Sequence, residues 1–150
     1  LMTDPTTCDG TWCYDRRSID RVDDWLEYTS FKTNLPFPFQ NRQFVVRNQV
    51  HQDPRTKEVL LVIGAAPDKA PPDDCCFRVT EMNNTWRFTP LENGLVEMEF
   101  TNNTDVGGFM PNLLMNTQRP KRLAGALLAM KDILYKKKYQ DATLDFIKEK

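Results

Sequence analysis

The chain has 150 residues, a length typical of one domain, and we predict a single domain over residues 1–150. Its 20 basic and 21 acidic residues nearly cancel, which gives no electrostatic reason to expect binding to nucleic acid and argues against strong attraction to anionic membranes. The sequence contains no run of about 18 apolar residues, so we expect no transmembrane helix.

The cysteines and the single histidine do not have the spacing of a metal site. The cysteines are Cys8, Cys13, Cys75 and Cys76, and the histidine is His51. We therefore predict no metal and no cofactor. A bridge between Cys8 and Cys13 stays open, whereas adjacent cysteines such as Cys75 and Cys76 rarely bond each other because the ring is strained.

The first third of the chain predicts a loop, two strands and a corner. Residues 1–18 are polar and rich in turn formers, so we expect a loop there, followed by a short strand at 19–22. Residues 25–33 are rich in β-branched and aromatic side chains, which favour a strand. The segment 35–39, Leu-Pro-Phe-Pro-Phe, predicts a corner or an edge, because proline cannot donate to a strand ladder.

A hairpin is expected next. Residues 43–51 alternate between apolar and polar side chains, which is typical of a half-buried strand. Residues 59–63 form an apolar run of strand length, and the turn at 53–56 joins the two strands. His51 falls on the polar face of the first strand, so we predict no catalytic role for it.

A long proline-rich loop at 66–76 precedes three further predicted strands, at 77–82, 86–89 and 95–100. Asn83-Asn84 and Glu92-Asn93-Gly94 are expected to supply the turns between them. Glu97 and Glu99 share the polar face of the last strand, so we interpret them as solvated charges rather than an acid–base pair.

The C-terminal part predicts a long helix that begins at Arg119 and Pro120. One apolar face follows at steps of four, three and four residues: Leu123, Leu127, Met130 and Leu134. We expect the tail after Lys138 to continue as helix. Strands followed by one long helix predict an α+β fold, with an antiparallel sheet and the helix lying across one face.

Several segments, in this order, resemble the START domain (the StAR-related lipid-transfer domain) of the helix-grip, or Bet v 1-like, superfamily. Residues 36–45, Pro-Phe-Pro-Phe-Gln-Asn-Arg-Gln-Phe-Val, resemble its proline-rich corner and the strand that follows. Residues 77–79 and 86–90 are similar to later strands, and 105–111, with Asn116 and Pro120, is similar to the entry into its final helix. The similarity covers residues 25 to 138.

The resemblance implies a curved antiparallel sheet wrapped around a long C-terminal helix, with a closed apolar tunnel for one lipid between them. It also implies that the loop at 66–76 forms part of the lid over that tunnel. A START domain begins with a helix and two strands that this sequence does not show, so we expect its N-terminal part to be missing. Thr29 and Asn48 stand where sterol-binding members carry an acid–arginine pair, which weakens a specific claim for sterols.

The side chains that this arrangement turns inward are the predicted ligand-binding set, with a solid packed core as the alternative interpretation. The set is Thr29, Phe31, Phe44, Val46, Asn48, Ile63, Phe77, Val79, Phe88, Val96, Met98, Phe100, Leu123, Leu127 and Met130. Asn48 lies on an apolar strand face, where a buried amide needs partners. We expect it to pair with Thr29, or else to orient a ligand head group.

These features predict a non-enzymatic module that binds, and can transfer, a lipid or other hydrophobic small molecule. We expect a soluble monomer, cytoplasmic or exported, that binds no nucleic acid and contacts membranes at most transiently. Two alternatives stay open. One is a polyketide cyclase-like enzyme on the same fold, using Glu27 or Glu81 if the strand phases slip by one residue. The other is a protein-interaction module without a ligand.

Overall fold

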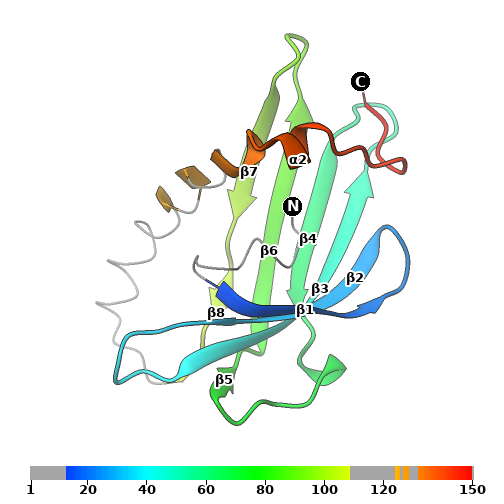
Figure 1. Cartoon of the computed structure of the whole chain (residues 1–150). Coiled ribbons are helices and arrows are strands. Elements are labelled where there is room, and N and C mark those ends of the chain that lie inside the picture. Colours follow the sequence, from blue (N-terminus) through cyan, green and yellow to red (C-terminus); the bar gives the residue numbers. More distant parts are fainter. Residues whose placement is uncertain (1–12, 109–123, 126, 129–131, 150) are drawn as a thin grey trace.

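Figure 1 shows the computed structural model of the chain, which describes residues 13–108, 124–125, 127–128 and 132–149. Most of these residues form one curved sheet, and a C-terminal segment crosses one of its faces (Figure 1). The predicted α+β class with a large, curved antiparallel sheet is confirmed.

Six strands lie side by side in the order of the sequence, and every neighbouring pair is antiparallel. They are β1 (Cys13–Arg21), β2 (Leu26–Thr33), β3 (Asn41–Gln52), β4 (Val59–Ala65), β6 (Glu81–Pro90) and β7 (Val96–Thr101). Two short strands complete the sheet, with β5 (Cys76–Arg78) beside β3 and β8 (Thr104–Asp105) beside β6. The β3–β5 pair is parallel, contrary to expectation, because the loop after β4 returns the chain to the start of β3.

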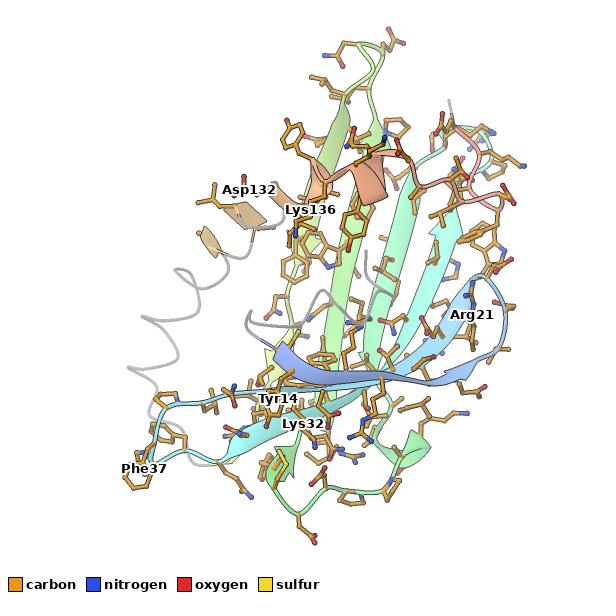
Figure 2. The ribbon with its side chains drawn as sticks, in the orientation of Figure 1. Tyr14, Arg21, Lys32, Phe37, Asp132 and Lys136 are labelled. Atoms are coloured by element: carbon orange, nitrogen blue, oxygen red, sulfur yellow. A yellow bond between two sulfur atoms is a disulfide. The ribbon has the colours of Figure 1, made fainter. Side chains whose placement is uncertain are left out.

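The predicted strands at 25–33, 43–51, 59–63 and 95–100 are confirmed to within about three residues at each end. The predicted corner is confirmed as well, since residues 34–40 join β2 to β3 outside the sheet. Phe37 projects from this corner and is 97% exposed (Figure 2).

The loop predicted over 1–18 is wrong for residues 13–18, which belong to β1. This strand is polar, with the sequence Cys-Tyr-Asp-Arg-Arg-Ser-Ile-Asp-Arg, and its second half is exposed. A polar sequence suits an edge strand, because charged side chains discourage pairing with other chains. Backbone pairing with β2, rather than any apolar alternation, therefore defines β1.

The turn predicted at Asn83-Asn84 is also wrong, because β6 continues through it from Glu81 to Pro90. The Asn84 side chain is buried, and its Oδ1 accepts hydrogen bonds from the Asn103 backbone N–H (2.9 Å) and the Thr104 hydroxyl (3.0 Å). A satisfied asparagine can remain in a central strand, since its side chain then does not compete for the strand's own backbone groups.

The described C-terminal residues contain helical backbone at 124–125, 127–128 and 132–134, and a short helix, α2 (Lys137–Gln140). The predicted helix start at Arg119 and Pro120 lies outside the described residues. The predicted extension of the helix past Lys138 is wrong beyond Gln140. No helix in the described parts of the chain is long and apolar enough to cross a membrane.

Tertiary contacts explain why the tail leaves the helix. The Phe146 ring meets the Trp25 ring edge-on at 5.0 Å between centroids. The Lys148 backbone exchanges two hydrogen bonds with the Gln52 amide, at 2.9 Å from its N–H to Oε1 and 2.8 Å from Nε2 to its carbonyl. These contacts fasten the tail to the upper ends of β2 and β3.

The loop between β4 and β5, residues 66–75, contains a short 3-10 helix, η2 (Pro67–Lys69). The Arg78 guanidinium donates to the carbonyl oxygens of Pro67, Ala70 and Pro71, and also to the Gln43 side chain. Further anchors are Tyr28 and Lys32, which contact Lys69 and Asp73. Gln43, Tyr28 and Lys32 all point away from the C-terminal segment, so this loop is fastened to the outer face rather than lying over the inner one as a lid.

The structure also bears on the two expectations about the cysteines. Cys75 and Cys76 form a disulfide, so the expectation that adjacent cysteines do not bond is wrong here. The turn that brings their sulfurs together is held by hydrogen bonds from Cys76 N–H to the Asp73 carbonyl and from Cys75 N–H to its carboxylate. Cys13 is also disulfide-bonded, and Cys8 lies outside the described residues.

Replacing Arg78 should loosen loop 66–75 specifically. In Arg78→Met the apolar stem remains, but three carbonyl groups lose their donor, so we expect unfolding to become easier by about 1–3 kcal/mol and loop amides to exchange at least tenfold faster. Hydrogen–deuterium exchange with mass spectrometry measures the loop directly. Arg87→Met, at an exposed arginine whose ion pairs are 3.6 Å long, is the control and should leave loop exchange unchanged.

Candidate functional site: the inner face of the sheet

The face of the sheet that carries the C-terminal segment, here called the inner face, is the candidate site. Leu127 packs on the core cluster of this face, and the Gln52–Lys148 contact fastens the tail at its upper end. Strand pairing decides which side chains share the face, because directly paired residues of neighbouring strands point to the same side.

The register places most of the predicted ligand-binding residues on the inner face, although ligand contact itself stays a prediction. These are Thr29, Phe31, Phe44, Val46, Asn48, Ile63, Phe88, Val96, Met98 and Phe100. Val79 joins the same core cluster, and Leu127 packs against it. Leu123 and Met130 lie outside the described residues. Exposure varies along the face: Val46 is 2% exposed, whereas Val96 is 60% and Met98 38% exposed.

Phe77 shares the phase of the inner face, because it pairs with Arg42, two residues before Phe44, and its ring lies at the lower end of the sheet. Its side chain is 38% exposed and lies under the Arg42 guanidinium, at 5.1 Å from the ring centroid. Arg42 donates to the carbonyl oxygens of Val106 (2.7 Å) and Gly107 (2.8 Å), and a Cβ at Gly107 would come within 2.3 Å of the Phe77 ring. Phe77 therefore closes the lower end of the sheet against residues 106–107, because β5 is short and pairs only with the start of β3.

Several inner-face residues lie outside the predicted ligand-binding set. Trp86, Leu61 and Val50 form one continuous row with Phe100, and Glu27 lies beside Asn48. The signal was the period of two in strands already predicted. Leu61 is two residues before Ile63, Trp86 is two before Phe88, and Glu27 is two before Thr29.

Aromatic pairs stand at both ends of the inner face. Near the lower end the rings of Phe31 and Phe44 stack at 4.8 Å between centroids. Farther up, Trp86 stacks on Phe100 at 4.2 Å and on Phe88 at 6.3 Å. The upper group lies towards β7, where the face is most exposed. Phe88 and Phe100 are partly exposed, so this part of the inner face presents an apolar surface of the kind that an acyl chain or ring system can cover.

A row of side chains that are polar except for Ile63, here called the polar row, crosses the inner face between the two aromatic groups. Glu27 pairs with Asn48, Asn48 with Ile63, and Ile63 with Asn84. Asn48 Nδ2 donates to Thr29 Oγ1 at 2.9 Å and to the Glu27 carbonyl at 3.3 Å, so the predicted Thr29–Asn48 pair is confirmed.

The two acidic residues of the enzyme alternative lie on opposite faces. Glu27 is on the inner face without any slip in strand phase, and its Oε1 accepts a 2.7 Å hydrogen bond from the Ser18 hydroxyl. Glu81 is exposed on the outer face. The pair therefore cannot converge on one substrate across the inner face.

The remaining sequence candidates lie on the outer face. His51, Glu97 and Glu99 are exposed there, as predicted, and Glu99 is 3.6 Å from Arg87. In the described residues no cluster of histidine, cysteine, aspartate or glutamate is arranged to hold a metal ion.

A charged hollow of about 440 Å³ lies between β1, β2 and loop 66–75. Lys32 Nζ contacts the Asp15 carboxylate at 2.9 Å and the Asp73 carboxylate at 2.5 Å, and Tyr14 and Lys32 lie close together in Figure 2. Hydrogen bonds from Arg17 and Lys32 hold the pKa of Asp15 well below its usual value. The bonds from Lys32 and from the Cys75 N–H lower the pKa of Asp73, and both carboxylates raise the pKa of Lys32. These charged groups pair with one another and link β1, β2 and loop 66–75, so we interpret them as structural. We call this group the Asp15–Lys32–Asp73 clasp.

A strongly curved antiparallel sheet with a C-terminal segment across its inner face belongs to the α+β class. No sequence model of a known protein family and no curated protein matches the chain.

Three solved structures share the fold. Human STARD10 is 13% identical, with a TM-score of 0.74 over 89% of this chain and 56% of that one. A STAR-related lipid transfer protein (fragment 25-204) from Xanthomonas axonopodis is 19% identical, with a TM-score of 0.72 over 83% of this chain and 69% of that one. The human StarD13 (DLC2) lipid transfer and protein localization domain is 18% identical, with a TM-score of 0.59 over 67% and 51%.

The chain therefore has the START fold that the sequence resemblance implied. It spans little more than half the length of STARD10 and about half that of the StarD13 domain.

Removing the acceptor of the Asn48 amide should destabilise the protein. Thr29→Val keeps the shape of the side chain but leaves a buried N–H without its partner, so we expect a loss of about 1–3 kcal/mol in the free energy of unfolding. Thr29→Ser retains the hydroxyl and should lose clearly less. Urea unfolding of both variants measures the difference, and equal losses would show that the hydroxyl contributes nothing.

The Asp15–Lys32–Asp73 clasp should make stability sensitive to acid. Both carboxyl groups have folded-state pKa values below the ordinary 3.8, so their contribution is present at neutral pH and is lost as the pH falls through and below that value. In Lys32→Met the loss of stability between about pH 5 and pH 2 should become shallower. Urea unfolding across this range tests the prediction, and Lys136→Met, at an exposed lysine, should retain the wild-type slope.

Proposed function

We propose that the chain binds one lipid or other hydrophobic small molecule between the inner face and the C-terminal segment, in the internal tunnel implied by its START resemblance. The observation that carries the proposal is the exposed apolar surface on the inner face, where Val96 and Met98 continue the row of aromatic side chains. The fold adds support, because two of its structural neighbours are named as a lipid transfer protein and a lipid transfer domain.

Burial of apolar surface would provide the binding free energy. Each 100 Å² of apolar surface removed from water contributes about 2.5 kcal/mol. Met98, Phe88 and Phe100 are the side chains best placed to contribute, since they are partly exposed and lie on the same face as the buried core. A ligand there would replace water over a surface that the described protein residues leave partly uncovered.

The proposed role is binding or transfer rather than catalysis. Acid–base catalysis needs converging groups with suitable pKa values, whereas the polar row places the Glu27 carboxylate beside the neutral side chains of Asn48 and Thr29. We further propose that the protein acts as a monomer. We also propose that it meets membranes only transiently, because its near-neutral net charge of −1 provides little attraction to anionic lipid.

A bulky side chain on the exposed part of the inner face should block the ligand. We expect Met98→Trp to weaken binding of a fluorescent fatty-acyl probe at least tenfold, because the indole occupies the space next to Phe88. Fluorescence titration measures the affinity, and circular dichroism checks that the fold survives. Val46→Trp tests the buried part of the same wall and should abolish uptake as well.

Glu97→Trp is the matched control, since it adds the same ring to the outer face of the same strand. It should bind the probe as the wild type does. If Met98→Trp and Glu97→Trp bind equally well, the ligand does not use the inner face at β7.

A further inference from the structure

The disulfide between Cys75 and Cys76 lies where loop 66–75 meets β5. Cys75 is exposed, whereas Cys76 is only 7% exposed. Cys13, the remaining cysteine among the described residues, is 4% exposed. A thiol can react with a disulfide only if it reaches one of the two sulfurs, so Cys75 offers the point of attack.

Tyr14 stands beside the buried sulfur of this disulfide. Its hydroxyl oxygen is 3.9 Å from Cys76 Sγ. A disulfide sulfur carries no hydrogen, so the hydroxyl is the donor in this weak contact. The same oxygen accepts a hydrogen bond from Asn41 Nδ2 at 3.0 Å, which leaves its own hydrogen for the sulfur. Cys76 therefore faces a donor that stabilises its sulfur as a thiolate.

The disulfide also closes the turn that fixes Asp73. The Cys75 N–H donates to the Asp73 carboxylate and the Cys76 N–H donates to its carbonyl oxygen, each at 3.1 Å. The same aspartate pairs with Lys32, and its own N–H donates to Gln43 Oε1 at 3.0 Å. On the other side of the disulfide, β5 pairs with the start of β3. The disulfide thus connects the anchored end of the loop to the sheet.

We propose that Cys75–Cys76 is a thiol–disulfide exchange site whose redox state sets how firmly loop 66–75 is held, and that its partner is a dithiol reductant. A dithiol fits the site better than a monothiol. Because the two cysteines are neighbours in the chain, the Cys76 thiolate stays close to a mixed disulfide on Cys75 and expels a monothiol, whereas a dithiol holds its second sulfur equally close.

The exchange takes two steps. A thiolate of the reductant attacks Cys75 Sγ, the bond between the two cysteine sulfurs breaks, and its electron pair stays on Cys76 Sγ, which Tyr14 stabilises. The second thiol of the reductant then loses its proton and attacks the reductant sulfur that is bound to Cys75, which releases Cys75 as a thiolate. The reductant loses two electrons and becomes a cyclic disulfide, and its two protons pass through solvent to Cys75 and Cys76.

The first experiment asks which sulfur is attacked and how reduction changes the loop. After brief treatment with mercaptoethanol and an acid quench, peptide mapping by mass spectrometry should find the mixed disulfide on Cys75 rather than Cys76. After reduction with dithiothreitol, circular dichroism should show that the sheet survives, and the amides of loop 66–75 should exchange with deuterium at least about threefold faster. A Cys75→Ser, Cys76→Ser double variant should show the faster exchange with or without dithiothreitol.

The second experiment tests the tyrosine. Tyr14→Phe keeps the ring and removes the donor to the leaving sulfur, so dithiothreitol should reduce Cys75–Cys76 at least about threefold more slowly. Tyr28→Phe, at another tyrosine of the outer face that contacts the same loop, should keep the wild-type rate. Attack at Cys76, an unchanged rate in Tyr14→Phe, or unchanged loop exchange after reduction would each overturn the proposal. None of these measurements involves a lipid, so their failure would leave the proposed function standing.

Discussion

The pairing register of β2, β3, β4 and β6 is the constraint on which the rest of this structure depends. Strand side chains alternate with a period of two, so a slip of one residue would exchange the two faces of a strand. In the observed register Val46, Ile63 and Trp86 all point to the side that carries the C-terminal segment. The buried Thr29–Asn48 hydrogen bond exists only in this register, because it joins neighbouring positions of β2 and β3.

The curved sheet is fastened at both ends, and the candidate site lies between. At the lower end Arg42 holds residues 106–107 against the start of β3, and Arg78 holds loop 66–75 on the outer face. At the upper end the tail is fixed through Gln52 and Trp25. These contacts use backbone carbonyls and ring edges away from the middle of the inner face, which keeps its apolar rows available for a ligand.

The sequence predicted those parts of the fold in which side-chain pattern and tertiary pairing agree. Residues 43–51 alternate clearly, so the strand and its inner face could be predicted, whereas the Thr29–Asn48 pair was expected from the START resemblance. Prediction failed where tertiary contacts override the local signal. β1 is polar and is defined by backbone pairing with β2, and Asn84 remains inside β6 because Asn103 and Thr104 satisfy its side chain.

The candidate site was predictable to a similar extent. Apolar side chains in alternating strands identify the inner face, but Phe77 lies in a strand whose parallel pairing with β3 has no local sequence signal. Glu27 shares the phase of Thr29, so its position on the inner face could have been predicted from the strand already expected.

The central claim is that an apolar ligand lies on the inner face, and β4 provides an internal comparison because its methyl groups alternate between the faces. Leu61 and Ile63 point inward, whereas Leu60 and Val62 point outward. Isotope-filtered NMR on methyl-labelled protein with bound lipid should give nuclear Overhauser effects from the acyl protons to Leu61 and Ile63. Contacts confined to Leu60 and Val62 would contradict the account.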